Sequence, residues 1–252
     1  MIRAARVFAV ALLSTVLSSV CVAQENAPAA RPAHPDPSVP VPKSDAGFMK
    51  QHQAFLKRTT QGPVDLLFLG DSITAGWATR GKDVWEKFYG SDHPANFGIG
   101  GDHVQNVLWR IENGELEHIS PKVTVLMIGT NDTAANSADE IAAGIEKLVS
   151  EIRHRLPNTK ILLLAIFPRG PHNANTGKFD DGVERMRVIR AVNARIAKLD
   201  DGHTVRYLDI GNKFLVDGRI PDDVMADQLH PTAKGYQIWA DAMQPLLEEM
   251  MR

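Results

Sequence analysis

The stretch Val64-Asp65-Leu66-Leu67-Phe68-Leu69-Gly70-Asp71-Ser72 decides the fold. It begins with a short, almost continuous apolar run that ends at a glycine, which is typical of a strand buried in a parallel sheet. The polar pair Asp71-Ser72 follows directly. We therefore expect a buried strand over residues 64–69 whose carboxyl end carries two side chains capable of chemistry.

Similar apolar runs alternate with helical patterns along the rest of the chain. They predict buried strands over residues 64–69, 123–128, 160–167 and 205–208. Apolar residues spaced three and four apart predict helices, and the sets are Val104, Val107, Leu108 and Ile111; Ile141, Ile145, Leu148 and Ile152; Met186, Ile189, Val192, Ile196 and Leu199; and Tyr236, Trp239, Met243 and Leu246. Pro245 is expected to kink or interrupt the last helix. This alternation predicts an α/β fold, a flavodoxin-like three-layer α/β/α sandwich around a parallel sheet.

The composition indicates one folded domain behind an extended lead. The chain has 252 residues, of which 44% are hydrophobic and 23% charged, as in ordinary globular proteins. We expect the domain over residues 48–252. Residues 24–47 carry six prolines among small and polar residues, so we predict a disordered, partly polyproline II lead there.

Residues 1–23 have the layout of a cleaved signal peptide. Arg3 and Arg6 precede an apolar run over residues 7–13, and the small residue Ala23 offers a cleavage site. The run is too short to favour a lasting membrane span. The alternative is an uncleaved, amphipathic N-terminal helix. We expect export, to the periplasm or the medium, and no stable span in the mature protein.

Cys21 is the only cysteine, and it would leave with the signal peptide. The mature chain would then form no disulfide or thiolate metal site and have no cysteine nucleophile. Lipid anchoring through Cys21 is a less favoured alternative, because residues 18–20 fit a lipobox poorly. Loss of Arg3 and Arg6 would leave a net charge of about −4. Without a basic run, we expect no nucleic-acid partner.

Ser72 is well placed to be a nucleophile. It leaves a buried strand and is expected to enter a helix N-terminus, which favours negative charge, although a simple N-cap serine is the alternative. Such a serine needs a base and the base needs an orienting acceptor. In Asp227-Gln228-Leu229-His230-Pro231, Asp227 can hold Nδ1 of His230 while Nε2 addresses Ser72. The alternative for this segment is a surface loop capped by Asp227.

Two further segments offer hydrogen-bond donors for an oxyanion. The glycine turn in Asn96-Phe97-Gly98-Ile99-Gly100-Gly101-Asp102 lets backbone N–H groups approach a ligand closely. Gly129-Thr130-Asn131-Asp132 places a carboxamide at another strand end. The turn lacks the Walker lysine and the full dinucleotide fingerprint, which disfavours nucleotide binding.

In order along the chain, Gly70-Asp71-Ser72, the turn at residues 98–101, Gly129-Thr130-Asn131 and Asp227-x-x-His230 resemble the four sequence blocks of the SGNH, or GDSL-type, hydrolase superfamily. Residues 96–102, 107–116 and 168–170 are similar to the catalytic subunits of intracellular platelet-activating-factor acetylhydrolases. The leader, the lead, His103 and Asp132 depart from that family. The general fold and chemistry are expected to survive these departures, whereas the substrate does not transfer.

The resemblance implies roles for individual residues. Ser72 would be the nucleophile, with His230 and Asp227 completing the catalytic triad. Ser72 N–H, Gly101 N–H and the Asn131 side chain would form the oxyanion hole. No cofactor is expected, because two-step acyl transfer through an acyl-enzyme needs none.

The expected activity is a serine esterase that removes short acyl groups, acetyl foremost, from a small-molecule or carbohydrate ester. The alternatives are a lysophospholipase or thioesterase, an O-acetyltransferase, and a noncatalytic carbohydrate-binding module, since fold alone does not fix function. Oligomeric state is left open.

Three residues near these segments are weaker predictions for substrate binding: Asp71, Trp77 and Arg169. Trp77 follows Ser72 closely, although aromatic residues at helical positions are more often core. Arg169 lies at a strand end, where it can bind an anionic substrate group or pair with a carboxylate. His93, His103 and His172 lack any metal-ligand spacing, so no metal site is expected.

Overall fold

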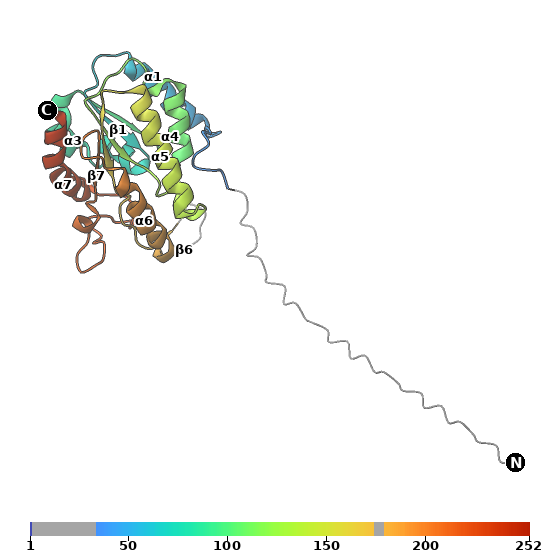
Figure 1. Ribbon diagram of the computed structural model, residues 1–252. Coiled ribbons are helices and arrows are strands. Elements are labelled where there is room, and N and C mark those ends of the chain that lie inside the picture. Colours follow the sequence, from blue (N-terminus) through green and yellow to red (C-terminus); the bar gives the residue numbers. More distant parts are fainter. Residues whose placement is uncertain (2–33, 174–178) are drawn as a thin grey trace. The chain divides into compact units, whose positions relative to one another are not determined.

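The computed structural model describes Met1 and residues 34–173 and 179–252 (Figure 1). The predicted signal peptide and the first part of the lead therefore lie outside the described residues, apart from Met1. The helices are α1 Ala46–Thr59, α2 Ser72–Ala75, α3 Lys82–Tyr89, α4 Val104–Arg110, α5 Ala138–Arg155, α6 Val183–Ile196 and α7 Ala233–Met251. The strands are β1 Leu66–Gly70, β2 Pro94–Gly98, β3 Val123–Met127, β4 Lys160–Leu164, β5 His172–Asn173, β6 Phe179–Asp180 and β7 Val205–Leu208. Short 3₁₀ or π turns are η1 Gly76–Ala78, η2 Gly90–Asp92, η3 Ile111–Glu115, η4 Asp132–Ala134, η5 Ala197–Leu199 and η6 Gly211–Phe214.

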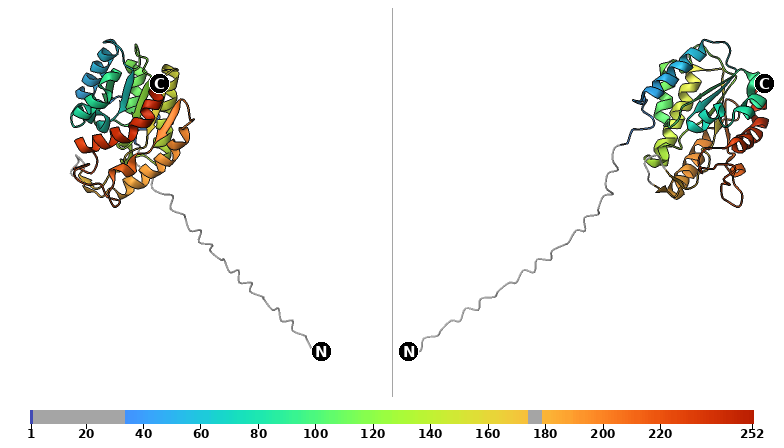
Figure 2. Two further views of the ribbon diagram at one scale, coloured as in Figure 1. Left: turned by 90° about the vertical axis from the view of Figure 1, so that its left-hand side faces the viewer. Right: turned by 180° about the vertical axis from the view of Figure 1, so that it is seen from behind.

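Five parallel strands form the central sheet in the order β2-β1-β3-β4-β7. Counted along the chain, these strands lie in the order 2-1-3-4-5, which is the flavodoxin-like arrangement. Helices cover both faces, with α4, α5 and α6 on one side and α3 and α7 on the other (Figures 1 and 2). The prediction of a three-layer α/β/α sandwich is confirmed.

Alternate residues of each strand supply the two halves of the core. In β1, Leu67 and Leu69 face the layer of α4, α5 and α6, whereas Leu66 and Phe68 face α3 and α7. This period of two follows from strand geometry. Each fully buried side chain of this size contributes about 1.5–3 kcal/mol relative to an exposed one, so β1 is held in place from both sides.

Arg110, at the end of α4, is fully buried beneath the carboxyl ends of β1 and β2. Its Nε donates to Asp102 Oδ2 at 2.9 Å, and its Nη1 pairs with Glu115. Its Nη2 donates to the carbonyl oxygens of Phe97 and Gly70 at 3.1 and 3.3 Å. One cation therefore ties two strand ends to the turn that follows β2.

The proline-rich lead differs from its prediction in the part that the structure describes. Residues 34–45, here called the strap, contact the domain, and α1 begins at Ala46 with Asp45 as its N-cap. Val41 exchanges hydrogen bonds with α4, donating to Gln105 O at 3.2 Å and accepting from Asn106 Nδ2 at 2.8 Å. Proline enrichment prevents a segment from building its own core, but its carbonyl oxygens can still bind side chains of a formed domain.

The strap also packs closely against α5. Pro37 is buried, and a Cβ on Gly144 would lie only 2.8 Å from the Pro37 ring carbon Cβ, so the close approach requires glycine there. Lys147 Nζ donates to Ser38 O at 2.9 Å. These contacts hold the strap along the helical layer instead of leaving it as a tether.

Two local features differ from the sequence analysis. Strand β2, which contains Asn96 and Gly98, was not among the predicted strands, because it is an edge strand that begins at Pro94 and carries little apolar signal. Pro245 does not interrupt α7. Its ring lies on the exposed side of the helix, while Trp239, Met243 and Leu247 bury the opposite side, so solvent can satisfy the carbonyl that loses its partner.

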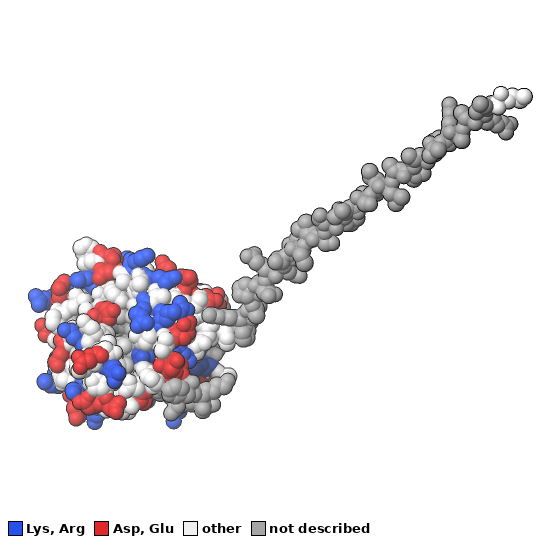
Figure 3. All heavy atoms as spheres, turned by 90° about the horizontal axis from the view of Figure 1, so that it is seen from below, with Lys and Arg blue, Asp and Glu red and all other residues white. Residues whose placement is uncertain are grey.

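The surface carries both signs of charge. On the face in Figure 3, basic and acidic side chains lie side by side. Exposed pairs such as Arg187–Glu184 on α6 contribute at most about 1 kcal/mol each. Within residues 34–173 and 179–252, every helix is too short or too polar to cross a lipid bilayer.

Candidate active site

The predicted chemical side chains meet at the carboxyl edge of the sheet. Ser72 follows β1, the glycine turn follows β2 and Asn131 follows β3. The strand order reverses at β1 and β3, and ligands of open α/β sheets bind in the crevice at such a switch point. The topology therefore accounts for why segments far apart in the sequence converge here.

Ser72, His230 and Asp227 form a continuous chain of hydrogen bonds. Ser72 Oγ and His230 Nε2 are 2.9 Å apart, although 158 residues separate them in the sequence. His230 Nδ1 and Asp227 Oδ2 are 2.6 Å apart. With its proton on Nδ1, the imidazole presents a basic Nε2 to the serine hydroxyl. This arrangement can remove the hydroxyl proton and stabilise the resulting imidazolium.

A tight turn fixes Asp227 against His230. Gln228 takes a left-handed backbone conformation with φ of 59°, and Asp227 Oδ1 accepts hydrogen bonds from Leu229 N at 3.1 Å and His230 N at 2.7 Å. Burial raises the pKa of Asp227, but the backbone N–H and ring of His230 outweigh burial and hold this pKa below its usual value. Asp227 is therefore kept ionised beside the imidazole.

Asp71 is a structural residue rather than a substrate ligand, which corrects its prediction. Its side chain is fully buried, and Oδ1 caps α2 by accepting from Ile73 N at 2.9 Å. Burial raises the pKa of Asp71 to about 7, and the nearby Asp102 and Asp132 add to this effect. Its Oδ2 has no hydrogen-bond partner among the described residues, which suits a protonated carboxyl. Ser72 is the first residue of the helix that Asp71 caps.

Trp77 is likewise a core residue, and its prediction as a substrate ligand is wrong. Its ring is fully buried and lies 4.5 Å from the Tyr236 ring and 5.0 Å from the Trp239 ring, measured between centroids. Proximity to Ser72 in sequence was misleading, because η1 turns Trp77 toward α7 and away from the crevice.

The glycine turn borders Ser72. A Cβ built on Gly100 would lie 4.0 Å from Ser72 Cβ, and Gly101 has a φ of +72°, which favours glycine. Asn131 Nδ2 donates to Asp102 O at 2.8 Å. A carboxamide has two N–H donors, so one can hold the turn while the second serves a ligand. The structure thus brings Gly101 and Asn131 to the site.

Lys43 is a site residue that sequence reasoning missed. This strap residue donates from Nζ to Gly100 O at 2.7 Å and forms an ion pair with Asp102 Oδ1 at 3.0 Å. A single lysine in a proline-rich segment gives no sequence signal for such a contact, because its partners lie more than fifty residues away. The contact is visible only in the folded chain.

His103, which is half-buried, pairs with the buried Asp132 at the turn. His103 Nδ1 lies 3.3 Å from Asp132 Oδ1, and Asp132 also accepts from Val104 N. Burial lowers the pKa of His103, but Asp132 outweighs it and leaves this pKa above its usual value. Among the residues that the structure describes, no group of three or more His, Cys, Asp or Glu side chains is arranged to hold a metal ion.

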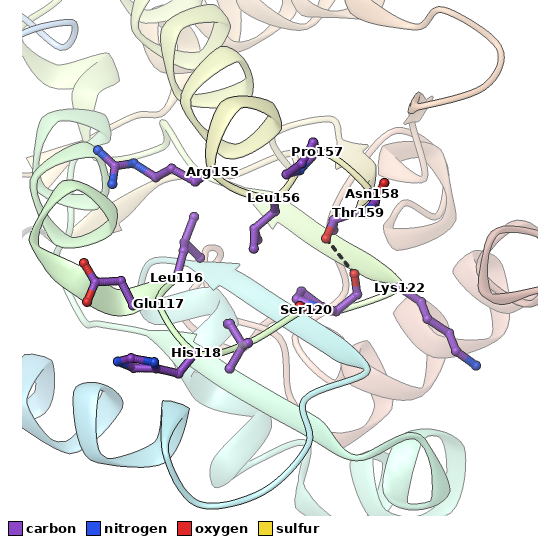
Figure 4. Close-up of a pocket in the computed structure, with 12 residues that line it drawn as sticks. Leu116, Glu117, His118, Ser120, Lys122, Arg155, Leu156, Pro157, Asn158 and Thr159 are labelled. Atoms are coloured by element: carbon purple, nitrogen blue, oxygen red, sulfur yellow. Dashed lines mark hydrogen bonds between the residues drawn. The ribbon is translucent and has the colours of Figure 1, made fainter.

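Two cavities lie at opposite edges of the sheet. One of about 670 Å³ is lined by residues 116–122 and 155–159, at the amino ends of β3 and β4, so it is remote from Ser72 (Figure 4). Thr159 Oγ1 donates to Pro121 O at 2.6 Å beneath it. The other, of about 460 Å³, is lined by Arg169 and by Gln228 of the His230 loop. The second adjoins the candidate site, because Gln228 lies between Asp227 and His230.

Comparison with known proteins identifies the family. Residues 68–238 match the GDSL-like lipase/acylhydrolase family. Platelet-activating factor acetylhydrolase IB subunit alpha2 of Rattus norvegicus is 37% identical and that of Homo sapiens 36% identical over 216 residues, covering 83% of this chain and 86% of each relative. A GDSL-like lipase structure from Bacteroides thetaiotaomicron has a TM-score of 0.65 at 20% identity, covering 79% of this chain and 97% of that one. The chain belongs to the GDSL-like lipase/acylhydrolase family and is an esterase.

The buried Asp71 gives a testable pH dependence of stability. Its pKa of about 7 in the folded protein exceeds the ordinary value of 3.8, so the unfolded state releases its proton first as pH rises. Relative to Asp71→Asn, which keeps the capping oxygen, wild-type unfolding free energy should fall between about pH 4 and pH 7, by up to about 4 kcal/mol. Denaturant unfolding at several pH values measures the difference. Asp139→Asn on the surface is the control, and parallel curves for wild type and Asp71→Asn would contradict the assignment.

Proposed function

We propose that this esterase hydrolyses short-chain acyl esters, acetyl esters foremost, with Ser72 as nucleophile and His230 and Asp227 as its proton-transfer partners. The observation that carries the proposal is the hydrogen-bonded chain from Ser72 Oγ through His230 to Asp227. The acetyl preference is supported by relatives 36–37% identical that are named acetylhydrolases. The alcohol part of the substrate, with a carbohydrate as one possibility, is left open by these relatives.

In the first half-reaction, Ser72 Oγ attacks the ester carbonyl while His230 Nε2 takes its proton. The imidazolium that forms is stabilised by ionised Asp227, which also keeps the ring in the productive tautomer. His230 then protonates the leaving alcohol, and the acyl group remains on Ser72. In the second half, water attacks this acyl-enzyme with His230 again as base, and the carboxylic acid leaves.

Three donors would hold the oxyanion in both halves. Ser72 N–H lies at the start of α2, Gly101 N–H lies in the turn that borders Ser72, and the Asn131 carboxamide follows β3. Each such donor is worth roughly 3 kcal/mol in the transition state. Asn131 and the turn are already joined through Asp102 O, so these donors need little rearrangement.

Lys43 would position the Gly101 donor. Because a peptide unit is planar and trans, its N–H and C=O point in opposite directions. Lys43 binds Gly100 O, which is the carbonyl of the same peptide unit that carries Gly101 N–H. Because Lys43 holds the Gly100 carbonyl toward the strap, the Gly101 N–H points the opposite way. This peptide unit cannot flip unless the hydrogen bond from Lys43 breaks.

The central prediction concerns Ser72. The protein should hydrolyse p-nitrophenyl acetate faster than the butyrate and octanoate, and Ser72→Ala should lower kcat by at least about 10⁴-fold. Asp227→Asn should lower kcat by about 10³–10⁴-fold, because the wrong imidazole tautomer is favoured. Circular dichroism establishes that the variants fold.

Faster octanoate hydrolysis would support a lysophospholipase or thioesterase. Equal rates for wild type and Ser72→Ala, without fluorophosphonate labelling, would support a noncatalytic binding module.

Lys43→Met should lower kcat by about tenfold to a hundredfold with little change in KM, because misplacement of an oxyanion donor affects the transition state most. Lys43→Arg should recover part of the rate. Lys147→Met removes a different contact to the strap, the hydrogen bond to Ser38 O, and is the matched control. Equal kcat losses in Lys43→Met and Lys147→Met would show that only strap docking matters.

We also propose that the chain is exported after cleavage behind Ala23, on the strength of the basic, apolar and small-residue order of residues 1–23. Expression of the full chain in a bacterial host, followed by fractionation and mass spectrometry, should find a mature N-terminus at Gln24. A cytoplasmic protein that retains residues 1–23 would contradict export. A lipid-modified Cys21 would instead support anchoring.

A further inference from the structure

The cavity beside the His230 loop has an unusual lining, and we name it the arginine pocket. Its volume is about 460 Å³, and its basic residues are Arg169, Arg190 and Arg219. The remaining lining is apolar or uncharged, including Met186 and Leu215, and none of the described lining residues is acidic. Three guanidinium groups therefore border one hollow, and no carboxylate stands among the described residues of its wall.

Arg169 is the most deeply buried of these cations. Its side chain is only 6% exposed, and its Nε has no hydrogen-bond partner among the described residues. The nearest carboxylate, that of Asp180, lies 4.0 Å away and makes a much closer pair with Arg185, at 2.6 Å. Burial and the charge of Arg185 lower the pKa of Arg169. A buried cation is costly unless it is paired and hydrogen-bonded, so a bound anion would stabilise Arg169.

Arg190 and Arg219 differ from Arg169 in being exposed. Neither forms an ion pair with another residue in the described part of the chain. They therefore add positive charge at the rim of the pocket, while Arg169 supplies buried N–H donors in its wall. A guanidinium binds carboxylate or phosphate oxygens with two parallel hydrogen bonds, which suits both kinds of anion.

The pocket adjoins the side of the site from which the alcohol departs. Gly170 N donates to Gln228 O at 2.8 Å, which joins the Arg169 segment to the loop between Asp227 and His230. In acyl transfer the histidine donates its proton to the leaving oxygen of the alcohol. The alcohol part of the ester therefore lies against this loop, next to the arginine pocket.

We propose that the arginine pocket binds an anionic group, a carboxylate or a phosphate, carried by the alcohol part of the ester substrate. This inference rests on the proposed function, because it is His230 as proton donor that places the alcohol on this side. Apolar Met186 and Leu215 would contact the carbon skeleton that links the anion to the ester. A neutral alcohol would supply no anion to Arg169, for which Asp180 offers only a carboxylate at 4.0 Å.

Matched acetyl esters test this proposal. The esters are 4-acetoxybenzoate and 4-acetoxyphenyl phosphate, with neutral 4-acetoxybenzamide as the reference. Wild type should show a kcat/KM at least about tenfold higher for one or both anionic esters, and the preferred anion distinguishes carboxylate from phosphate. Arg169→Gln should lower the kcat/KM of the anionic esters to that of the benzamide.

Further variants separate a binding role from a structural one. Arg190→Gln, on an exposed residue, should weaken the preference without affecting folding, and it decides the question if Arg169→Gln does not fold. Arg187→Gln is the matched control, because Arg187 lies on the same helix, is exposed and pairs with Glu184. An absent anion preference in wild type, or a preference unchanged in both Arg169→Gln and Arg190→Gln, would overturn the proposal.

Calorimetric titration with inorganic phosphate keeps this test independent of catalysis. Wild type and Ser72→Ala should both bind phosphate, and Arg169→Gln should bind it at least about tenfold more weakly. If Ser72→Ala remains active, the proposed function fails, yet loss of phosphate binding in Arg169→Gln would still support an anion site. If Ser72→Ala is inactive but phosphate binds equally to all variants, the arginine pocket proposal alone fails.

Discussion

The buried guanidinium of Arg110 is the interaction on which the site geometry depends. It joins two carboxylates, those of Asp102 and Glu115, to the carbonyls that end β1 and β2. Removal of this cation would leave two buried acids near each other, and breaking a buried pair in this way costs about 3–5 kcal/mol. Because Ser72 follows the end of β1 and the glycine turn follows β2, Arg110 fixes Ser72 and the turn relative to each other.

Asp102 extends that network into the active site. Its carboxylate contacts Arg110 from the core and Lys43 from the strap, and its carbonyl accepts from Asn131. Burial nevertheless raises the pKa of Asp102 above its usual value, while the charges of Arg110 and Lys43 act in the opposite direction. The glycine turn is therefore held by three parts of the structure: the core, the strap and the end of β3. Because these contacts fix the turn before a substrate binds, they preorganise the candidate active site.

Local patterns predicted the features that are encoded locally. Four strands of the central sheet (β1, β3, β4 and β7) and helices α4, α5, α6 and α7 were predicted because each lies in a short run with its own periodicity. Ser72, Asp227 and His230 were singled out by their spacing in the sequence. The strap was missed because its docking is encoded in partners such as Asn106 and Lys147, distant in sequence. Helices α1 and α3 were also not predicted. Asp71 and Trp77 were misassigned because nearness to Ser72 along the chain says nothing about which way a side chain points after a tight turn.

The docked strap changes what counts as the functional part of this chain. The family match begins at residue 68, inside β1, and leaves out α1 together with every strap contact. A fragment trimmed to that match would lack the first two of the five residues of β1 and the only lysine on Gly100 in the described structure. Lys43 lies in the strap, after the predicted signal peptide of residues 1–23 and two residues before Asp45, the N-cap of α1. If residues 1–23 direct export as proposed, the N-terminal region would first direct the chain out of the cytoplasm. After cleavage, its remaining part, the strap, would hold the glycine turn of the candidate active site.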